Sequence, residues 1–212
     1  MKPKNRKKGT LMIAIGLLLL SAALFLTIYN IYDSRRAEEA AKEVLPDLRS
    51  YMEEAGGETT TWKEQEGQKE ESDKPIFTNP DREMPAFKVN GYRYIGILEV
   101  PALDLELPVM EEWDYSRLKI APCLYTGSVY KDNMVIAGHN YAKHFSPIKN
   151  LPVGTEITFT DGENRVFEYE IGWIEVLEGT AVEEMITGDW DMTLFTCTYG
   201  GEARYAVRCF KK

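Results

Sequence analysis

The chain has 212 residues, of which 44% are hydrophobic, so it is long enough for one domain of moderate size with additional segments. Its net charge of −9 is unevenly distributed, because residues 1–9 carry five basic groups and no acidic group. No strongly basic stretch follows residue 9, which disfavours nucleic-acid binding. The three cysteines are too few, and odd in number, for a disulfide framework.

A basic head, residues 1–9, precedes an apolar segment, residues 10–32. Up to Tyr29 this segment contains no charged side chain, and about 20 apolar residues span a bilayer as a helix. Tyr29 and Tyr32 lie at its far end, where interfacial aromatic residues are found. Because the basic head marks the cytoplasmic side, we expect a single-pass cell-membrane anchor with the rest of the chain outside. A cleaved signal peptide is the competing interpretation, but the apolar run continues past Ser21-Ala22-Ala23, beyond the usual length of about 7–15 residues.

Residues 33–85 are predicted to form a stalk and linker. From Asp33 to about Glu54, Ala, Glu, Arg and Leu favour a helix, which we expect to be interrupted near Pro46. Its apolar face is thin, so a solvated stalk is favoured over a helix that binds a partner. Residues 55–85 are charged and poor in apolar side chains, which indicates a flexible acidic linker between the membrane and the next domain.

Residues 86–212 are predicted to form an all-β domain with short helices. Alternating or continuous apolar runs predict strands. The clearest runs are 92–100, 103–109, 134–137, 155–160, 166–171, 193–197 and 205–210. Asp161-Gly162 predicts a hairpin turn, and Asp114 is a candidate N-cap for a short helix. Short strands at close spacing with few helices indicate a closed β-barrel.

Three chemically active side chains lie at predicted strand ends. Cys197 ends one strand, a Gly200-Gly201 turn follows, and Arg204 begins the next strand. This arrangement places a thiol close to a fixed positive charge, a setting in which a thiolate is stabilised. His139 follows the run 134–137 and is a candidate proton carrier. Together these side chains provide a nucleophile, a base and an anion stabiliser.

Other residues of the same types have simpler interpretations. His144 lies in a polar segment and is expected to be solvated, and Arg208 is an alternative to Arg204 on the same strand face. Cys123 and Cys209 are expected to be small buried apolar side chains, although a disulfide between them is conceivable.

Several segments together resemble the sortase family of cysteine transpeptidases, over roughly residues 85–212. They are Ile136–Asn140, Thr193–Thr198 and Arg204–Val207, and Tyr94–Pro101 resembles the first core strand of that family. The resemblance implies an eight-stranded barrel. It also implies that Cys197 is the nucleophile, that His139 protonates the leaving amine and deprotonates the incoming one, and that Arg204 binds the substrate carbonyl or oxyanion.

The resemblance further implies cleavage of an LPXTG-like C-terminal sorting signal through a Cys thioester. The acyl group would then pass from the secreted surface protein to an amine of a peptidoglycan precursor or a pilin, in a Gram-positive-type bacterium. Asn140, Thr196 and Tyr199 are candidate substrate-binding residues. Two alternatives stay open: a membrane-tethered cysteine peptidase in which water replaces the amine, and a non-catalytic binding module.

The subclass signals within the family are mixed. Cys197-Thr198-Tyr199 and Gly138-His139-Asn140 resemble class B, whereas the short interval between His139 and Cys197 resembles classes A and D. The Asp-Pro-aromatic lid motif of some members is absent, and Asn79-Pro80-Asp81 is a poor substitute. We expect no cofactor and no metal ion. Calcium is a weak alternative that would use loop acids, which are Asp161, Glu163, Glu183 and Glu184.

Overall fold

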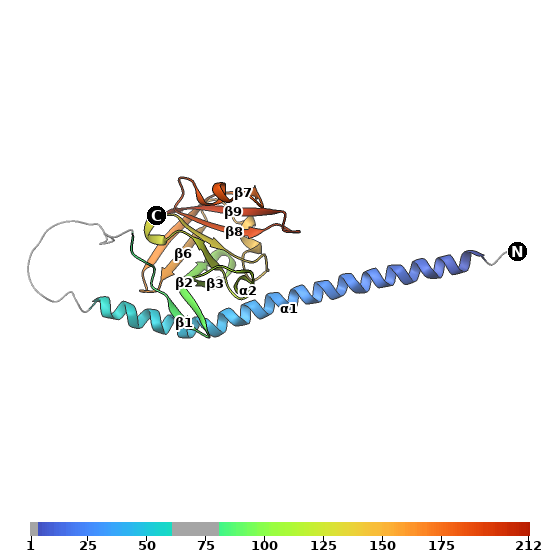
Figure 1. The fold of residues 1–212 in the computed structure, drawn as a ribbon, viewed down its shortest axis with the longest axis horizontal. Helices are drawn as coiled ribbons and strands as arrows, with labels where there is room; N and C mark the ends of the chain where they lie inside the picture. Colours follow the sequence, from blue (N-terminus) through green and yellow to red (C-terminus); the bar gives the residue numbers. More distant parts are fainter. Residues whose placement is uncertain (1–3, 61–80) are drawn as a thin grey trace, which may run out of the picture.

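The structure is a computed structural model that describes residues 4–60 and 81–212. One long helix, α1 (Lys4–Thr60), runs past a β-barrel built from the second described range (Figure 1). The N-terminal half of α1 projects beyond the barrel and is exposed, whereas part of its C-terminal half is buried against the barrel. Residues 1–3 of the predicted basic head and residues 61–80 of the predicted linker lie outside the described residues.

Short helices and turns connect the strands of the barrel. The strands are β1 (Phe87–Val89), β2 (Tyr92–Val100), β3 (Leu105–Met110), β4 (Cys123–Thr126), β5 (Met134–Ala137), β6 (Glu156–Asp161), β7 (Val166–Glu178), β8 (Met192–Cys197) and β9 (Ala203–Lys211). The helices between them are η2 (Pro101–Leu103), α2 (Tyr115–Leu118), η3 (Val129–Lys131), η4 (Ser146–Asn150) and α3 (Val182–Ile186).

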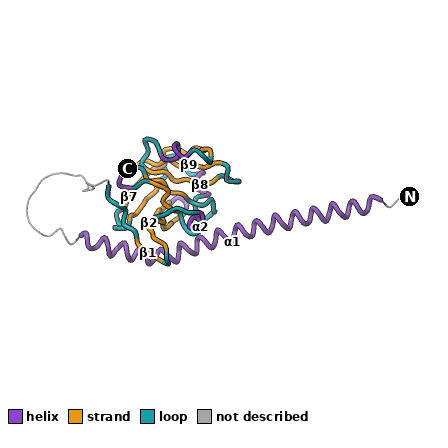
Figure 2. The backbone as a smooth tube through the Cα atoms, viewed as in Figure 1, coloured by secondary structure: helices purple, strands orange, loops and turns teal. Residues whose placement is uncertain are grey.

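The barrel is a closed ring of strands. The sheet runs in the order β2-β3-β4-β5-β8-β9-β7-β6, and pairing of β6 with β2 closes it into eight strands (Figure 2). β1 is an additional short strand that pairs with the start of β2. The prediction of an eight-stranded closed barrel is therefore confirmed. As a fold class for the whole chain, "all-β" is a slight overstatement, because α1 contributes 57 helical residues.

Apolar side chains fill the interior of the barrel. Leu98, Ile136, Phe159, Leu194 and Val207 come from five different strands and are each 0% exposed. Their spacing follows the alternation of a strand that is buried on one face. A fixed interior of this kind holds the strand ends, which carry the chemistry, in a constant relation to one another.

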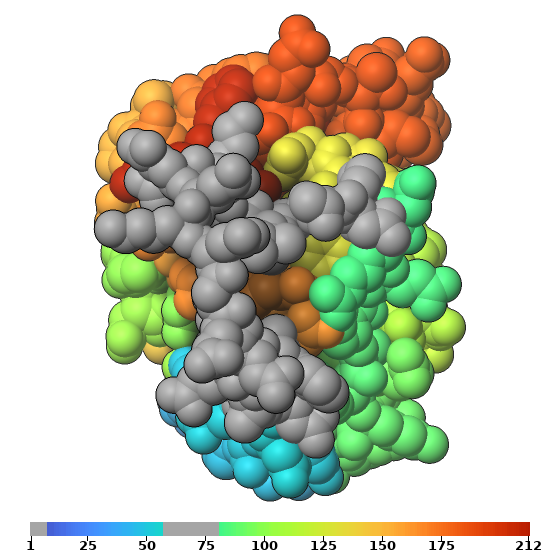
Figure 3. Space-filling model, turned by 90° about the vertical axis from the view of Figure 1, so that its left-hand side faces the viewer, coloured from blue at the N-terminus to red at the C-terminus, as the bar shows by residue number. Residues whose placement is uncertain are grey.

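The C-terminal half of α1 packs on the outside of the barrel. Ala37, Ala41, Val44, Leu48 and Met52 recur every three or four residues and are each 4% exposed or less. Val44, Leu48 and Met52 join a second apolar cluster with residues of β1, β2 and β4. Figure 3, seen from the C-terminal end of α1, shows this end of the helix (cyan) directly beneath the barrel.

Two predictions for residues 33–85 were therefore wrong. The segment from 37 to 52 is not a solvated stalk, because its narrow apolar stripe is covered by the barrel. The helix also continues through Pro46, which is exposed. Packing of the stripe compensates for the hydrogen bond that a proline removes from a helix.

Local turn and cap predictions were confirmed. Asp161 ends β6, and the turn after it connects β6 to the antiparallel β7. Asp114 caps α2, because its carboxylate accepts hydrogen bonds from the backbone N–H groups of Ser116 and Arg117.

Candidate active site

The pairing of β8 and β9 brings Cys197 and Arg204 together. These two residues are direct partners in the antiparallel register. Directly opposed residues in such a pair project from the same face, with their Cβ atoms about 5 Å apart. The strand pairing therefore fixes the thiol and the guanidinium as neighbours.

The turn after Cys197 is shaped by its glycines. Gly200 and Gly201 both have positive φ, at 91° and 78°, which side chains other than glycine rarely adopt. Hydrogen bonds from Thr198 N to Ala203 O, and from Gly201 N to Thr198 O, close the turn. The thiol thus lies where a buried strand enters a tight turn.

His139 reaches the same place from β5. β5 runs parallel to β8, with Ala137 opposite Phe195, and the N–H of Gly138 donates to the carbonyl of Phe195 at 2.9 Å. If this register continued for two more residues, His139 would lie opposite Cys197. Glycine is required at 138, because a Cβ there would lie 2.2 Å from the ring of Phe145.

The imidazole of His139 is half-buried and stacks on Tyr141, with ring centroids 3.7 Å apart. Burial lowers the pKa of His139 below its ordinary value, and the nearby charge of Lys119 lowers it further. Asp33 of α1 acts in the opposite direction. Within the described part of the chain, the buried Nδ1 atom has no hydrogen-bond partner.

An aromatic pocket of about 170 Å³ is lined by Phe195 of β8 and Arg204 of β9, the strands that carry Cys197 and its register partner. Its lining includes Trp113, Tyr125, Phe195, Met185 of α3 and Arg204. Tyr125 meets both Trp113 and Phe195 edge-on, at 5.9 and 5.3 Å between ring centroids. Phe195 precedes Cys197 by two residues, so it lies on the same strand face.

Arg204 keeps donor groups available in this pocket. Its Nη1 atom donates to the carbonyl oxygens of Gly201 at 2.8 Å and Ala203 at 3.0 Å. A guanidinium has five N–H donors, so others remain for a substrate carbonyl or oxyanion. The backbone bonds hold the group at the turn while it stays partly exposed.

The three candidate substrate-binding residues have different environments. Asn140 is half-buried and follows His139 directly. Tyr199 is 84% exposed in the turn after Cys197, with the ammonium of Lys149 5.7 Å from its ring. Thr196 is only 1% exposed and faces away from Cys197 on β8, so it does not share the face of Phe195 and Arg204.

The expectation for His144 was wrong. Its side chain is 0% exposed rather than solvated, and burial lowers its pKa to about 4. It lies in the loop that carries His139, with its ring centroid 5.9 Å from that of Tyr141.

Arg208 does not serve as an alternative to Arg204, because it is 0% exposed and fully engaged. It donates to the carboxylate of Glu175 and to the carbonyl oxygens of Glu184 and Met185, at 2.7–2.8 Å. Its guanidinium also lies 3.8 Å from the ring of Trp190. These bonds fasten α3, which forms one wall of the aromatic pocket, to β9.

The remaining cysteines have no place in the site. Cys123 and Cys209 are both buried and free, as predicted for small apolar side chains, and burial raises the pKa of each thiol to about 12. In residues 4–60 and 81–212, no three His, Cys, Asp or Glu side chains gather in a way that could hold a metal ion. Asp161 instead accepts hydrogen bonds from Tyr130 and Arg165. Independence from calcium stays a prediction.

Sequence reasoning missed the partners of the catalytic candidates. No sequence signal placed these partners near His139 or Arg204, because they come from loops and short strands without a periodic pattern. They are Tyr141 and Lys119 near His139, and Trp113 and Tyr125 in the pocket with Arg204. Asp33 is different. It begins a stripe with helical spacing that continues through Ala37, and this spacing is readable in the sequence.

Solved structures with the same barrel are sortases. The sortase C structure from Streptococcus pneumoniae is 22% identical over 82% of this chain and 96% of its own, with a TM-score of 0.54. Sortase C from Clostridium perfringens SM101 is 20% identical over 88% and 97%, with a TM-score of 0.50. Sortase C-3 from S. pneumoniae is 17% identical over 85% and 90%, with a TM-score of 0.51. These likenesses concern the fold, and the subclass stays a prediction.

A family model gives the assignment. Residues 98–211, just over half of the chain, match the Sortase domain. The chain therefore belongs to the sortase family of cysteine transpeptidases. A search of curated proteins found no match.

Proposed function

We propose that this protein is a membrane-anchored sortase that cleaves an LPXTG-like sorting signal and transfers the acyl part to an amine of the cell wall or a pilin. The observation that supports the proposal is the strand register, since Cys197 pairs with Arg204 across β8 and β9, and His139 follows β5 two residues after its last pair with β8. The family assignment supports the same chemistry.

The proposed reaction has two halves. The Cys197 thiolate attacks the peptide carbonyl, and a guanidinium N–H of Arg204 stabilises the oxyanion. The C–N bond breaks, the imidazolium of His139 gives its proton to the departing amine, and a thioester remains. In the second half an amine attacks the thioester carbonyl, neutral His139 takes its proton, and Cys197 leaves as the thiolate.

The aromatic pocket supports a peptide substrate. Its volume of about 170 Å³ suits one branched apolar side chain such as leucine. Arg204 belongs to the same lining, so a residue held by Trp113 and Tyr125 would place the following backbone carbonyls near the guanidinium. This order agrees with a signal in which the apolar residue precedes the scissile bond.

The test uses the full chain with a panel of labelled LPXTG-like peptides and an added amine. We expect Cys197→Ala to abolish transfer and to leave no acyl-enzyme detectable by mass spectrometry. The matched control, Cys209→Ala, removes a buried thiol and should retain transfer. Transfer at the wild-type rate by Cys197→Ala would contradict the proposal.

The products separate the remaining alternatives. Free acid as the only product at every amine concentration would favour a peptidase, in which water resolves the thioester. No turnover, and no labelling of Cys197 by a thiol-reactive peptide analogue, would favour a binding module. Pilin and cell-wall amines can be compared as acceptors in the same assay.

The proposed anchor is the exposed half of α1. Its apolar window has a mean hydropathy of 2.7 and none of it is buried. We propose that this half crosses the membrane with its basic end in the cytoplasm, following the positive-inside rule. Release of the full chain from membranes by salt alone, rather than by detergent, would contradict the anchor.

A further inference from the structure

The loop after β5 connects the catalytic histidine to the long helix. Tyr141 lies in this loop, two residues after His139, and is 5% exposed. One face of its ring stacks on the His139 imidazole. The charged and polar groups that influence its hydroxyl are Tyr29, Asp33 and Arg36, all on α1. Tyr141 therefore lies between the imidazole and the helix.

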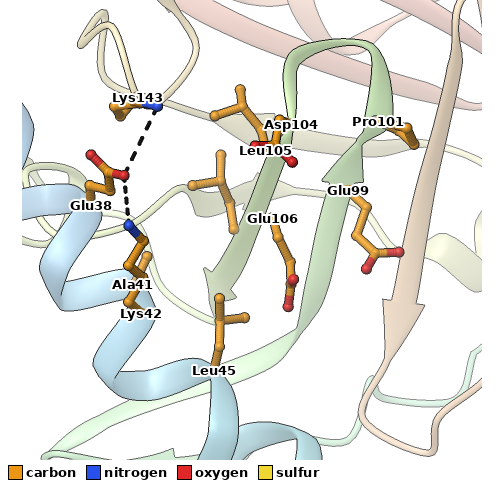
Figure 4. Close-up of a pocket in the computed structure, with 11 residues that line it drawn as sticks. Glu38, Ala41, Lys42, Leu45, Glu99, Pro101, Asp104, Leu105, Glu106 and Lys143 are labelled. Atoms are coloured by element: carbon orange, nitrogen blue, oxygen red, sulfur yellow. Dashed lines mark hydrogen bonds and ion pairs between the residues drawn. The ribbon is translucent and has the colours of Figure 1, made fainter.

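Small buried side chains lie on α1 near the loop after β5. Ser34 and Ala37 are 9% and 1% exposed, although Arg35 and Arg36 between them are exposed. One turn after Ser34, the carboxylate of Glu38 lies 4.0 Å from the ammonium of Lys143, which belongs to the loop after β5. Figure 4 shows Glu38 reaching from α1 toward Lys143, at one end of a groove of about 460 Å³ between α1 and β3.

Backbone hydrogen bonds make the loop a compact unit. Phe145 N donates to His139 O at 3.1 Å, and Ser146 N donates to Tyr141 O at 3.2 Å. His144 N also donates to Tyr141 O, at 3.1 Å. A displacement of Tyr141 would therefore displace His139 as well.

We propose that Tyr141 is a positioning residue through which the docked segment 33–38 of α1 holds the His139 imidazole in its working orientation. The inference rests on the proposed sortase function, in which His139 moves the proton. It gives the membrane-proximal helix a second task besides anchoring: activity requires that segment 33–38 remain docked on the barrel.

The first test separates positioning from folding with the full chain in lipid nanodiscs. Tyr141→Ala removes the stacking surface, so kcat should fall roughly 10- to 100-fold while KM for the peptide changes little, since misplacement of a catalytic group has effects of that size. Tyr141→Phe keeps the ring and should restore kcat. The control Tyr51→Ala removes a different aromatic stack, the one between Tyr51 of α1 and Phe87 of β1, and should retain kcat.

Wild-type kcat for Tyr141→Ala would overturn the inference. So would an equal loss of kcat in Tyr51→Ala, because it would show that general weakening of the helix contact is responsible. If Cys197→Ala retained transfer, the proposed function would fail instead, and the titration test below would still judge the contact between α1 and His139.

The second test uses charge. The titratable and charged groups around His139 are Asp33 from α1, Lys119 from the segment after α2, and Tyr141 and His144 from its own loop. Cys197 ends the neighbouring strand β8. Asp33→Asn removes the group that favours imidazolium, so the pKa of His139 should fall. Because imidazolium is the proton donor, the alkaline limb of kcat should move to lower pH.

Nuclear magnetic resonance of the two histidines measures the same shift without turnover, with His144 assigned by substitution. The matched control Asp47→Asn makes the same change on an exposed turn of α1 and should leave the titration unchanged. An unchanged His139 titration in Asp33→Asn would overturn the docking of segment 33–38 beside the base.

Discussion

At the scale of single residues, the two histidines show how different degrees of burial give the same side chain different properties. His139 is half-buried and accessible at the end of β5, whereas His144 is 0% exposed. Both have lowered pKa values because burial disfavours the charged imidazolium. The shift is larger for His144, so this residue couples protonation to folding rather than to catalysis.

We predict that His144 makes folding stability depend on pH. Its folded pKa of about 4 is below the ordinary value of 6.5, so its contribution is complete above pH 6.5 and is lost as pH falls toward 4. Between pH 7.5 and 5 the wild type should lose roughly 2 kcal/mol of unfolding free energy through this group. Denaturant unfolding of His144→Phe at both pH values should show a smaller loss. A loss equal to that of the wild type would contradict the prediction.

The catalytic candidates could be predicted because strand ends and turns leave clear signals. Cys197 and His139 each follow an apolar run, and Gly200-Gly201 marks the turn before Arg204. The sequence carries no comparable signal for whether a polar side chain is buried, so the predictions for His144 and Arg208 were wrong. A polar residue in a loop or strand reads as solvated unless its buried partners are known, and those partners come from distant parts of the chain.

At the scale of elements, α1 combines two different surfaces in one helix. Residues 10–32 are uncharged and mostly apolar on all sides, whereas the second half carries the stripe of Ala37, Ala41, Val44, Leu48 and Met52. The barrel strands were predictable because their two-residue alternation is strong and local. The docking of α1 was not, since a narrow stripe also occurs on solvated helices and Pro46 argued for a break.

We predict that this stripe stabilises the whole molecule. Leu48 is 0% exposed against the barrel, so Leu48→Ala leaves a cavity and should lower the unfolding free energy by roughly 2–5 kcal/mol. Glu53→Ala, on an exposed position of the same helix, should change it by less than about 0.5 kcal/mol. The measurement is denaturant unfolding of the full chain in detergent. Equal unfolding free energies for the two variants would contradict the prediction, because they would show that the stripe does not unfold together with the barrel.

At the scale of the whole molecule, α1 links the proposed membrane span to the barrel without a described break. The turn between β8 and β9 points toward the end from which the exposed half of α1 projects (Figure 1). The first buried residue of α1 is Ser34, two residues after Tyr32 at the predicted membrane boundary. Under the proposed anchoring, the thiol would work close to the membrane surface, at a height fixed by a rigid helix rather than by a flexible linker.

The last prediction tests this height. Duplicating residues 33–39 adds about two helical turns, which keeps the docking face and raises the barrel by about 10 Å. Turnover of a soluble signal peptide should stay unchanged, because the groove and the docked copy of the segment remain intact. Turnover of the same signal placed directly after a membrane-spanning peptide in the same vesicles should fall roughly tenfold, since the scissile bond no longer reaches the thiol in its near-attack geometry. Equal turnover of both substrates by the duplication variant would show that the helix does not set the working distance.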